Sequence, residues 1–135
     1  MEHNSDFKYD LDLGLIGESF VASLFGNRTL EVKFDFEAYR TGNFYIEYMS
    51  RGRISGIAKT EADYWILIAA TEKGGRHKES IAALEPDDVL YAIMISTPRL
   101  KKLCKTAYHR RDVPGGDSNT SIGVLIKSKV LLENE

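Results

Sequence analysis

Acidic and basic side chains alternate along residues 29 to 35, TLEVKFD. Glu31, Lys33 and Asp35 occupy every second position there, and Glu47 lies in a second alternating segment. Carboxylate oxygens are the ligands that Mg²⁺ prefers, and water and substrate phosphate usually complete its coordination shell. A bound metal polarises a phosphoryl oxygen and acidifies a water molecule, while a nearby lysine stabilises developing negative charge. These residue types therefore suit metal-dependent hydrolysis of a phosphodiester.

Each of these side chains has an expected role. Asp35 and Glu47 are the predicted metal pair, and Lys33 is predicted to orient water or the transition-state phosphate. Glu31 and Glu18 are predicted secondary ligands that complete the site or support a second ion roughly 3.5–4 Å away. The alternative is an ordinary charged surface, whose ion pairs are each worth from a few tenths to about 1 kcal/mol.

The segment from residue 13 to 25, LGLIGESFVASLF, repeats apolar side chains at a helical period. Apolar residues also fill most of the opposite side, so the helix is predicted to be largely buried. Glu18 is the one charge between Asp12 and Arg28. A buried carboxylate is costly unless it is paired or bound to a metal, so Glu18 is expected to join the site.

Two strands are expected to carry the remaining site residues. Residues 29 to 35 and 43 to 51 both alternate polar and apolar side chains, and a polar connection separates them. The two segments are predicted to form an antiparallel hairpin whose apolar faces meet one core. That register places Glu47 on the face of Glu31, Lys33 and Asp35.

Four further elements follow from the second half of the sequence. The continuous apolar run YWILIAA, residues 64 to 70, predicts a central buried strand. Pro86 is expected to open a short helical turn before a strand at residues 89 to 95. A basic helix is predicted from about residue 99 to 108, and a glycine turn then precedes a strand at residues 122 to 126.

The composition limits the class of protein. With 135 residues and 43% hydrophobic composition, the chain is expected to form one domain, residues 1 to 135, around one core. The acidic opening segment and the lack of an 18-residue apolar run predict an intracellular protein without membrane spans. One cysteine and three scattered histidines argue against thiolate zinc chemistry.

Positive charge is concentrated locally. The net charge of −2 argues against non-specific coating of nucleic acid, yet residues 99 to 111 hold six basic side chains and no acidic one. This run is a candidate phosphate-facing surface, and a solvated helix face is the equal alternative. The predicted phosphate contacts are Arg51, Arg53, Lys101, Lys102, Lys105, Arg110 and Arg111.

The order of a helix glutamate, then ExKxD on one strand and TGNxxxE on the next, resembles the PD-(D/E)XK nuclease superfamily. The likeness covers residues 14 to 68 best. The stretches GLIGESFVASLF, EVKFD, YRTGNFYIEYMSRGRISGIAKTEADYW and GGDSNTSIGVLI look like a group of small, mostly phage-encoded proteins of that superfamily. In this resemblance Asp35 and Glu47 match the acidic residues of the split motif. Met49 stands where its lysine would be, so Lys33 is expected to substitute from the neighbouring strand.

The resemblance implies an α/β fold of the restriction-endonuclease-like kind, with a mixed β-sheet flanked by helices. It also implies a Mg²⁺-dependent DNA endonuclease, with Mn²⁺ as a substitute metal. The expected partner is double-stranded or branched DNA, in the cytoplasm of a bacterial host if the chain is phage-encoded, and a homodimer would allow both strands to be cut. One alternative is a DNA- or junction-binding module of the same fold without catalysis. The other is a non-enzymatic interaction protein.

Overall fold

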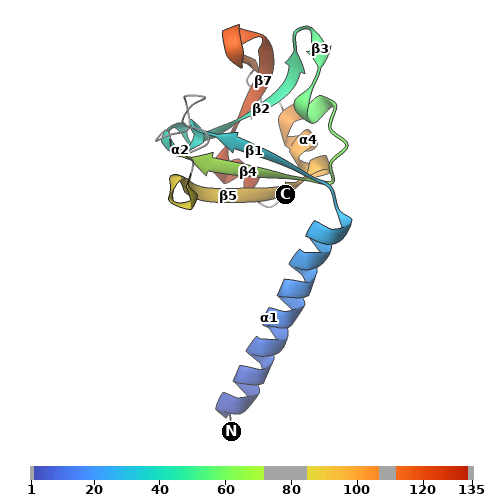
Figure 1. Ribbon diagram of the computed structural model, residues 1–135, viewed down its shortest axis with the longest axis vertical. Helices are drawn as coiled ribbons and strands as arrows, with labels where there is room; N and C mark the ends of the chain where they lie inside the picture. The colour runs from blue at the N-terminus through green and yellow to red at the C-terminus, as the bar shows by residue number, and fades with distance from the viewer. Residues whose placement is uncertain (1, 72–84, 107–111, 134–135) are drawn as a thin grey trace.

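The computed structural model describes residues 2–71, 85–106 and 112–133 (Figure 1). It begins with the long helix α1 (Glu2–Asn27), which leaves the rest of the molecule and extends away from both sheets (Figure 1). The large apolar side chains of α1 are mostly exposed, Ile16 by 66% and Phe20 by 61%, and only Leu24 is buried. The prediction that this helix is largely buried is therefore wrong. The helix is apolar, as its sequence indicates, but little of the same chain packs against it.

The first sheet has three strands in the order β1-β4-β5, with β1 (Leu30–Asp35), β4 (Tyr64–Ala70) and β5 (Val89–Ser96). β1 runs parallel to β4, and β5 runs antiparallel to it. The predicted central position of residues 64 to 70 is confirmed, because β4 lies between the other two strands. The strand expected at residues 89 to 95 is confirmed as β5, and the short helix η2 (Pro86–Asp88) precedes it.

The second sheet has four antiparallel strands in the order β3-β2-β7-β6. They are β2 (Asn43–Ser50), β3 (Arg53–Ile54), β6 (Asp112–Gly115) and β7 (Ser121–Lys127). β2 pairs with β3 and β7, not with β1. The predicted hairpin of residues 29–35 and 43–51 is therefore wrong, because the two strands belong to different sheets.

Short helices connect and cover these sheets. They are α2 (Ala38–Thr41), η1 (Gly56–Ala58), α4 (Thr97–Lys105), η3 (Asp117–Asn119) and α5 (Ser128–Leu131). Ser96 is the N-cap residue of α4, and its hydroxyl accepts a hydrogen bond from the Arg99 amide at 3.4 Å. The predicted basic helix is confirmed over residues 99 to 105, and residues 107 to 111 lie outside the described part of the chain.

One core lies between the two sheets and is shared by both. Its largest buried side chains are Trp65 and Leu67 from β4, Phe44 and Ile46 from β2, and Leu100 from α4. The expected α/β class, with sheets flanked by helices, is thereby confirmed. No helix in the described ranges is both long enough and apolar enough to cross a membrane.

Candidate metal and phosphate site

β1 places its charged side chains on the face of the sheet that carries the buried residues of β4. Glu31, Lys33 and Asp35 lie beside Trp65, Leu67 and Ala69 of β4, which are among the most deeply buried residues. Leu30, Val32 and Phe34 consequently lie on the outer face of the sheet, with Val32 48% and Phe34 47% exposed. The predicted common face of the three charges is confirmed, but the prediction that the apolar face meets the core is wrong. Alternation fixes which residues share a face, and it leaves open which face points inward.

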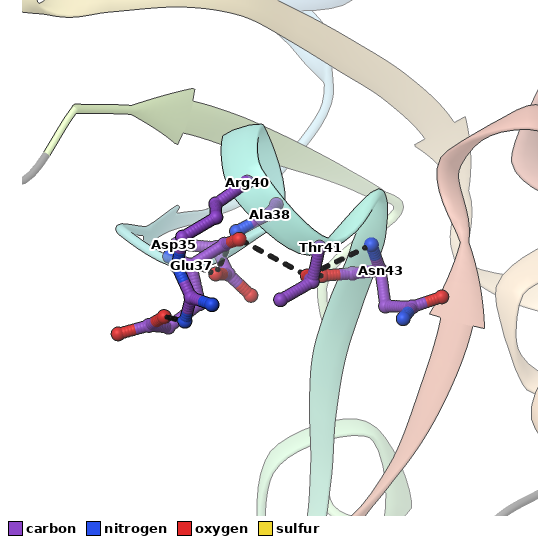
Figure 2. A network of polar contacts seen from close by, with 6 residues as sticks. All are labelled: Asp35, Glu37, Ala38, Arg40, Thr41 and Asn43. Atoms are coloured by element: carbon purple, nitrogen blue, oxygen red, sulfur yellow. Dashed lines mark hydrogen bonds and ion pairs between the residues drawn. The ribbon is translucent and has the colours of Figure 1, made fainter.

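Asp35 binds three backbone amides from two elements. Its Oδ1 accepts hydrogen bonds from the Glu37 and Ala38 amides, each at 2.9 Å, at the start of α2. Its Oδ2 accepts one from the Tyr45 amide of β2 at 3.0 Å. Figure 2 shows Asp35 beside the first turn of α2, where Arg40 forms an ion pair with Glu37. Asp35 therefore joins the end of β1 in one sheet to β2 in the other.

Partial burial raises the pKa of the Asp35 carboxyl above its ordinary value, and the hydrogen bonds from Tyr45 and Ala38 oppose that rise. Burial is the larger effect, because it removes water from the charged form of the carboxylate. No cation is paired with Asp35 among the ion pairs of the described residues. A carboxylate kept charged at neutral pH in this position would gain from a nearby positive charge.

Glu47 lies on β2, two residues beyond the Tyr45 that Asp35 contacts. It pairs with Gly123 of β7, and the register shifts between Glu47 and Met49, which is the pattern of a β-bulge. Bulges redirect side chains and are frequent next to active sites. The half-buried Glu47 accepts a hydrogen bond through Oε2 from the Ser55 hydroxyl at 2.8 Å. One of its carboxylate oxygens is therefore held in place by the segment that leads into η1.

Gly56 makes this arrangement possible. It has a φ of +50°, and a Cβ atom there would lie 2.2 Å from the Glu47 carbonyl oxygen. We expect Gly56→Ala to push the Ser55 region off β2 and to cost about 1–3 kcal/mol of unfolding free energy beyond the strain of the backbone angle. Gly52→Ala is the matched control, because Gly52 has a φ of +77° but open space around it. Urea denaturation of both variants measures the difference, and equal losses would contradict the close contact.

Lys33 is held by two neighbours on β1 and β4. Its Nζ lies 3.0 Å from Oε1 of Glu31 and 6.0 Å from the centre of the Trp65 ring. Both side chains of this ion pair remain partly exposed, 50% for Lys33 and 39% for Glu31. An exposed pair of this kind contributes little stability, so Lys33 can exchange Glu31 for another anion at small cost.

An open depression of about 460 Å³ lies next to Glu31. Its wall is formed by β1 and by the residues around η1, including Gly56, Lys59 and Glu61. Gly56 in turn packs on the backbone of Glu47. We use the word seam for the line where the free edge of β1 approaches β2 and η1: Glu31 and Gly56 border the depression, and the Asp35 carboxylate contacts the Tyr45 amide of β2.

Glu18 does not reach this seam. It is exposed on α1, which points away from the sheets (Figure 1). Within one chain the structure therefore does not bring Glu18 together with Glu31, Asp35 or Glu47. Because Glu18 is exposed, its carboxylate does not need a partner. Among the described residues, no three His, Cys, Asp or Glu side chains lie close enough together to hold a metal ion. An ion bound by these described residues of one copy would therefore contact fewer than three such side chains.

The predicted phosphate contacts fall into two groups. Arg51 and Arg53 are exposed at the β2–β3 turn, where Arg51 has a φ of 52° and Gly52 follows it. Lys101, Lys102 and Lys105 lie on α4, and Lys101 and Lys105 border a cavity of about 360 Å³ beside η1. Arg110 and Arg111 lie outside the described residues. The structure places both described groups near η1 and β2, the elements that also hold Glu47.

Three residues that support the site have no clear signal in the sequence. Ser55 binds Glu47, the Tyr45 amide binds Asp35, and Lys59 borders the depression. All three depend on contacts between segments that local alternation does not relate to one another. The segment SRGRISG, residues 50 to 56, is rich in serine and glycine, which indicates only a turn.

Comparison of the chain with protein-family models, with curated proteins and with solved structures gave no significant match.

Proposed function

We propose that this protein is a metal-dependent deoxyribonuclease whose site lies on the seam between β1 and β2. The observation that carries this proposal is the orientation of β1, which places Glu31, Lys33 and Asp35 beside the buried residues of β4 and places Val32 and Phe34 on the outer face of the sheet. Burial of the apolar face would be the more stable choice for an ordinary edge strand. Sites where local rules fail in this way are expected to be functional.

The donor chemistry of the seam fits a hard divalent cation. Asp35 and Glu47 offer carboxylate oxygens, and Mg²⁺ is commonly held by one or two carboxylates with water and phosphate as its other ligands. From the described residues Asp35 accepts three hydrogen bonds and Glu47 accepts one, fewer than the roughly four that the two oxygens of a carboxylate allow. When bound, Mg²⁺ supplies a polarised phosphoryl oxygen and a more acidic water.

The chain's own residues supply position and charge. Asp35 is fixed by three amides and Glu47 by Ser55, so neither needs to be ordered when the substrate arrives. Lys33 shares the face of Asp35 and is released from Glu31 at small cost, which suits it to stabilise negative charge on the scissile phosphate. Arg51, Arg53 and the α4 lysines would hold the neighbouring phosphates of the DNA backbone.

Cleavage assays test this proposal. Supercoiled, linear and branched DNA are incubated with the protein in Mg²⁺, in Mn²⁺ and in EDTA. We expect cleavage in either metal, none in EDTA, and loss of cleavage in Glu47→Gln. The matched control is Glu85→Gln, which replaces an exposed glutamate ahead of η2. Absence of cleavage on every substrate in both metals would contradict the proposal.

The pH dependence of stability tests the environment of Asp35. Its folded-state pKa is raised above the ordinary value of 3.8, so its stabilising contribution is full below that value and declines as pH rises through the folded-state pKa. Without divalent metal, the wild type is therefore expected to lose stability relative to Asp35→Asn across this window. Urea denaturation of both proteins at a series of pH values measures the difference. A relative gain of the wild type with rising pH would contradict a raised pKa.

A second candidate is a DNA-binding module of the same fold that does not cleave. The three amide contacts of Asp35 favour it, because they give that carboxylate a structural role without any metal. Met49 at the place of the family's lysine points the same way. DNA binding that persists in EDTA, together with no cleavage in Mg²⁺ or Mn²⁺, would support this module over the enzyme.

A further inference from the structure

The three-stranded sheet has an outer face that is apolar across all its strands. We define this outer face by Val32 and Phe34 of β1, Ile66 and Ile68 of β4, and Ala92 and Met94 of β5. The strand registers place these residues beside one another, since Val32 pairs with Ile66, Ile66 with Met94, and Ile68 with both Phe34 and Ala92. Val32, Phe34 and Met94 are 48%, 47% and 38% exposed, and none of the six residues is polar. A contiguous apolar patch of this kind marks an interaction surface.

Helix α1 is the second uncovered apolar surface. Leu13, Ile16 and Phe20 follow one another at spacings of three and four residues, so they share one face of the helix. They are 48%, 66% and 61% exposed, whereas Leu24, the next residue on this face, is buried within its own chain. No charged side chain interrupts this stripe. It matches the uncharged outer face of the sheet in chemistry.

The connection between α1 and β1 prevents the helix from folding onto its own sheet. The Arg28 amide still donates to the Leu24 carbonyl at 3.1 Å, which continues the helical hydrogen bonds to the end of α1. Thr29 is already fixed in the sheet, because its amide donates to Asp63 at 3.0 Å and its carbonyl accepts from Tyr64 at 3.1 Å. Connections between helices and strands usually take two to six residues. Here Arg28 alone is left to reverse the chain.

We propose that α1 of a second copy covers the outer face of the sheet, and that two copies exchange their helices reciprocally. The lengths are compatible, since the exposed stripe from Leu13 to Phe20 extends about 12 Å and the seven residues of β4 extend about 23 Å. Exchange of an identical element between copies is a common route to symmetric dimers. The pair of contacts buries both apolar surfaces at once and leaves the seam of the candidate site on the other side of the sheet.

Light scattering after size-exclusion chromatography tests the exchange with two matched lesions. Phe20→Asp places a charge on the helix stripe, and Phe34→Asp places one on the outer face. The control is Ile54→Asp, since Ile54 is 61% exposed on β3 of the other sheet. We expect the wild type and Ile54→Asp to be dimers. The dimer dissociation constant of each Phe variant is expected to be at least a hundredfold higher than that of the wild type.

Mixing the two lesions identifies the arrangement. A Phe34→Asp copy keeps an intact helix, and a Phe20→Asp copy keeps an intact outer face, so the mixture is expected to form heterodimers through one unaltered contact. A monomeric wild type would overturn the proposal, as would a Phe34→Asp variant that dimerises through its helices alone. Failure of the mixture to associate would also overturn the proposal, because it would show no contact between the helix of one copy and the outer face of another. If Phe34→Asp loses its circular dichroism signal, Val32→Asp replaces it in the same experiment.

Discussion

Asp35→Ala is expected to abolish DNA cleavage and to lower the free energy of unfolding by several kcal/mol. The cleavage loss should be roughly a thousandfold or more, because metal stabilisation of the transition state is worth several kcal/mol and 1.36 kcal/mol is a factor of ten. The stability loss follows from the amides of Glu37, Ala38 and Tyr45, which lose their acceptor. Leaving buried donors unsatisfied costs about 1–3 kcal/mol each. Gel assays and thermal denaturation measure the two effects.

Two further variants separate the catalytic loss from the structural one. Asp35→Asn keeps one carbonyl acceptor, so it should recover part of the stability but not the cleavage. Asp87→Asn is the matched control at an exposed position of η2 and should retain both. If Asp35→Asn cleaves DNA at the wild-type rate, Asp35 is a structural residue and not a metal ligand.

Lys33→Ala is expected to slow cleavage by about a hundredfold to a thousandfold, the usual effect of removing a group that stabilises transition-state charge. Its stability should change little, because the Lys33–Glu31 pair is half exposed and such pairs are worth at most about 1 kcal/mol. Single-turnover cleavage at saturating metal measures the rate, and urea denaturation measures the stability.

Lys127→Ala is the control for this loss, since Lys127 is exposed at the end of β7. It removes the same charge from the molecule and should leave the rate unchanged. If Lys33→Ala binds DNA more weakly but cleaves saturating DNA at the normal rate, Lys33 binds the DNA phosphates and does not stabilise the transition state.

Much of the fold follows from local patterns in the sequence. The apolar run of β4, the alternation of β1 and β2 and the proline before β5 each predicted an element at the right place. These elements are set by local propensity and by the period of burial, which neighbouring residues determine among themselves. The α/β class could be predicted for the same reason.

The partners of those elements could not be predicted. β1 and β2 follow one another along the chain, which favoured a hairpin, yet β1 pairs with β4 and β2 with β7. The orientation of β1 could not be predicted either, since alternation gives the same pattern whichever face points to the core. The prediction that α1 is buried was wrong for the same reason. In both cases the sequence records that a surface is apolar and does not record what covers it.

The residues of the candidate site were chosen from the sequence, and the way the structure arranges them could not be predicted from it. Glu31, Lys33 and Asp35 do share a face, but Glu47 approaches from the second sheet and Glu18 does not approach at all. The contacts that unite the seam are the Asp35 bond to Tyr45 and the Glu47 bond to Ser55. Both depend on how the two sheets meet.

The most direct test of the proposed metal site is a crystal of the protein soaked in Mn²⁺ and measured for anomalous scattering. We expect one anomalous peak within coordination distance of both the Asp35 and Glu47 carboxylates, and its loss in crystals of Glu47→Gln. A soaked crystal with no peak on the seam, or with a peak that touches neither carboxylate, would contradict the account.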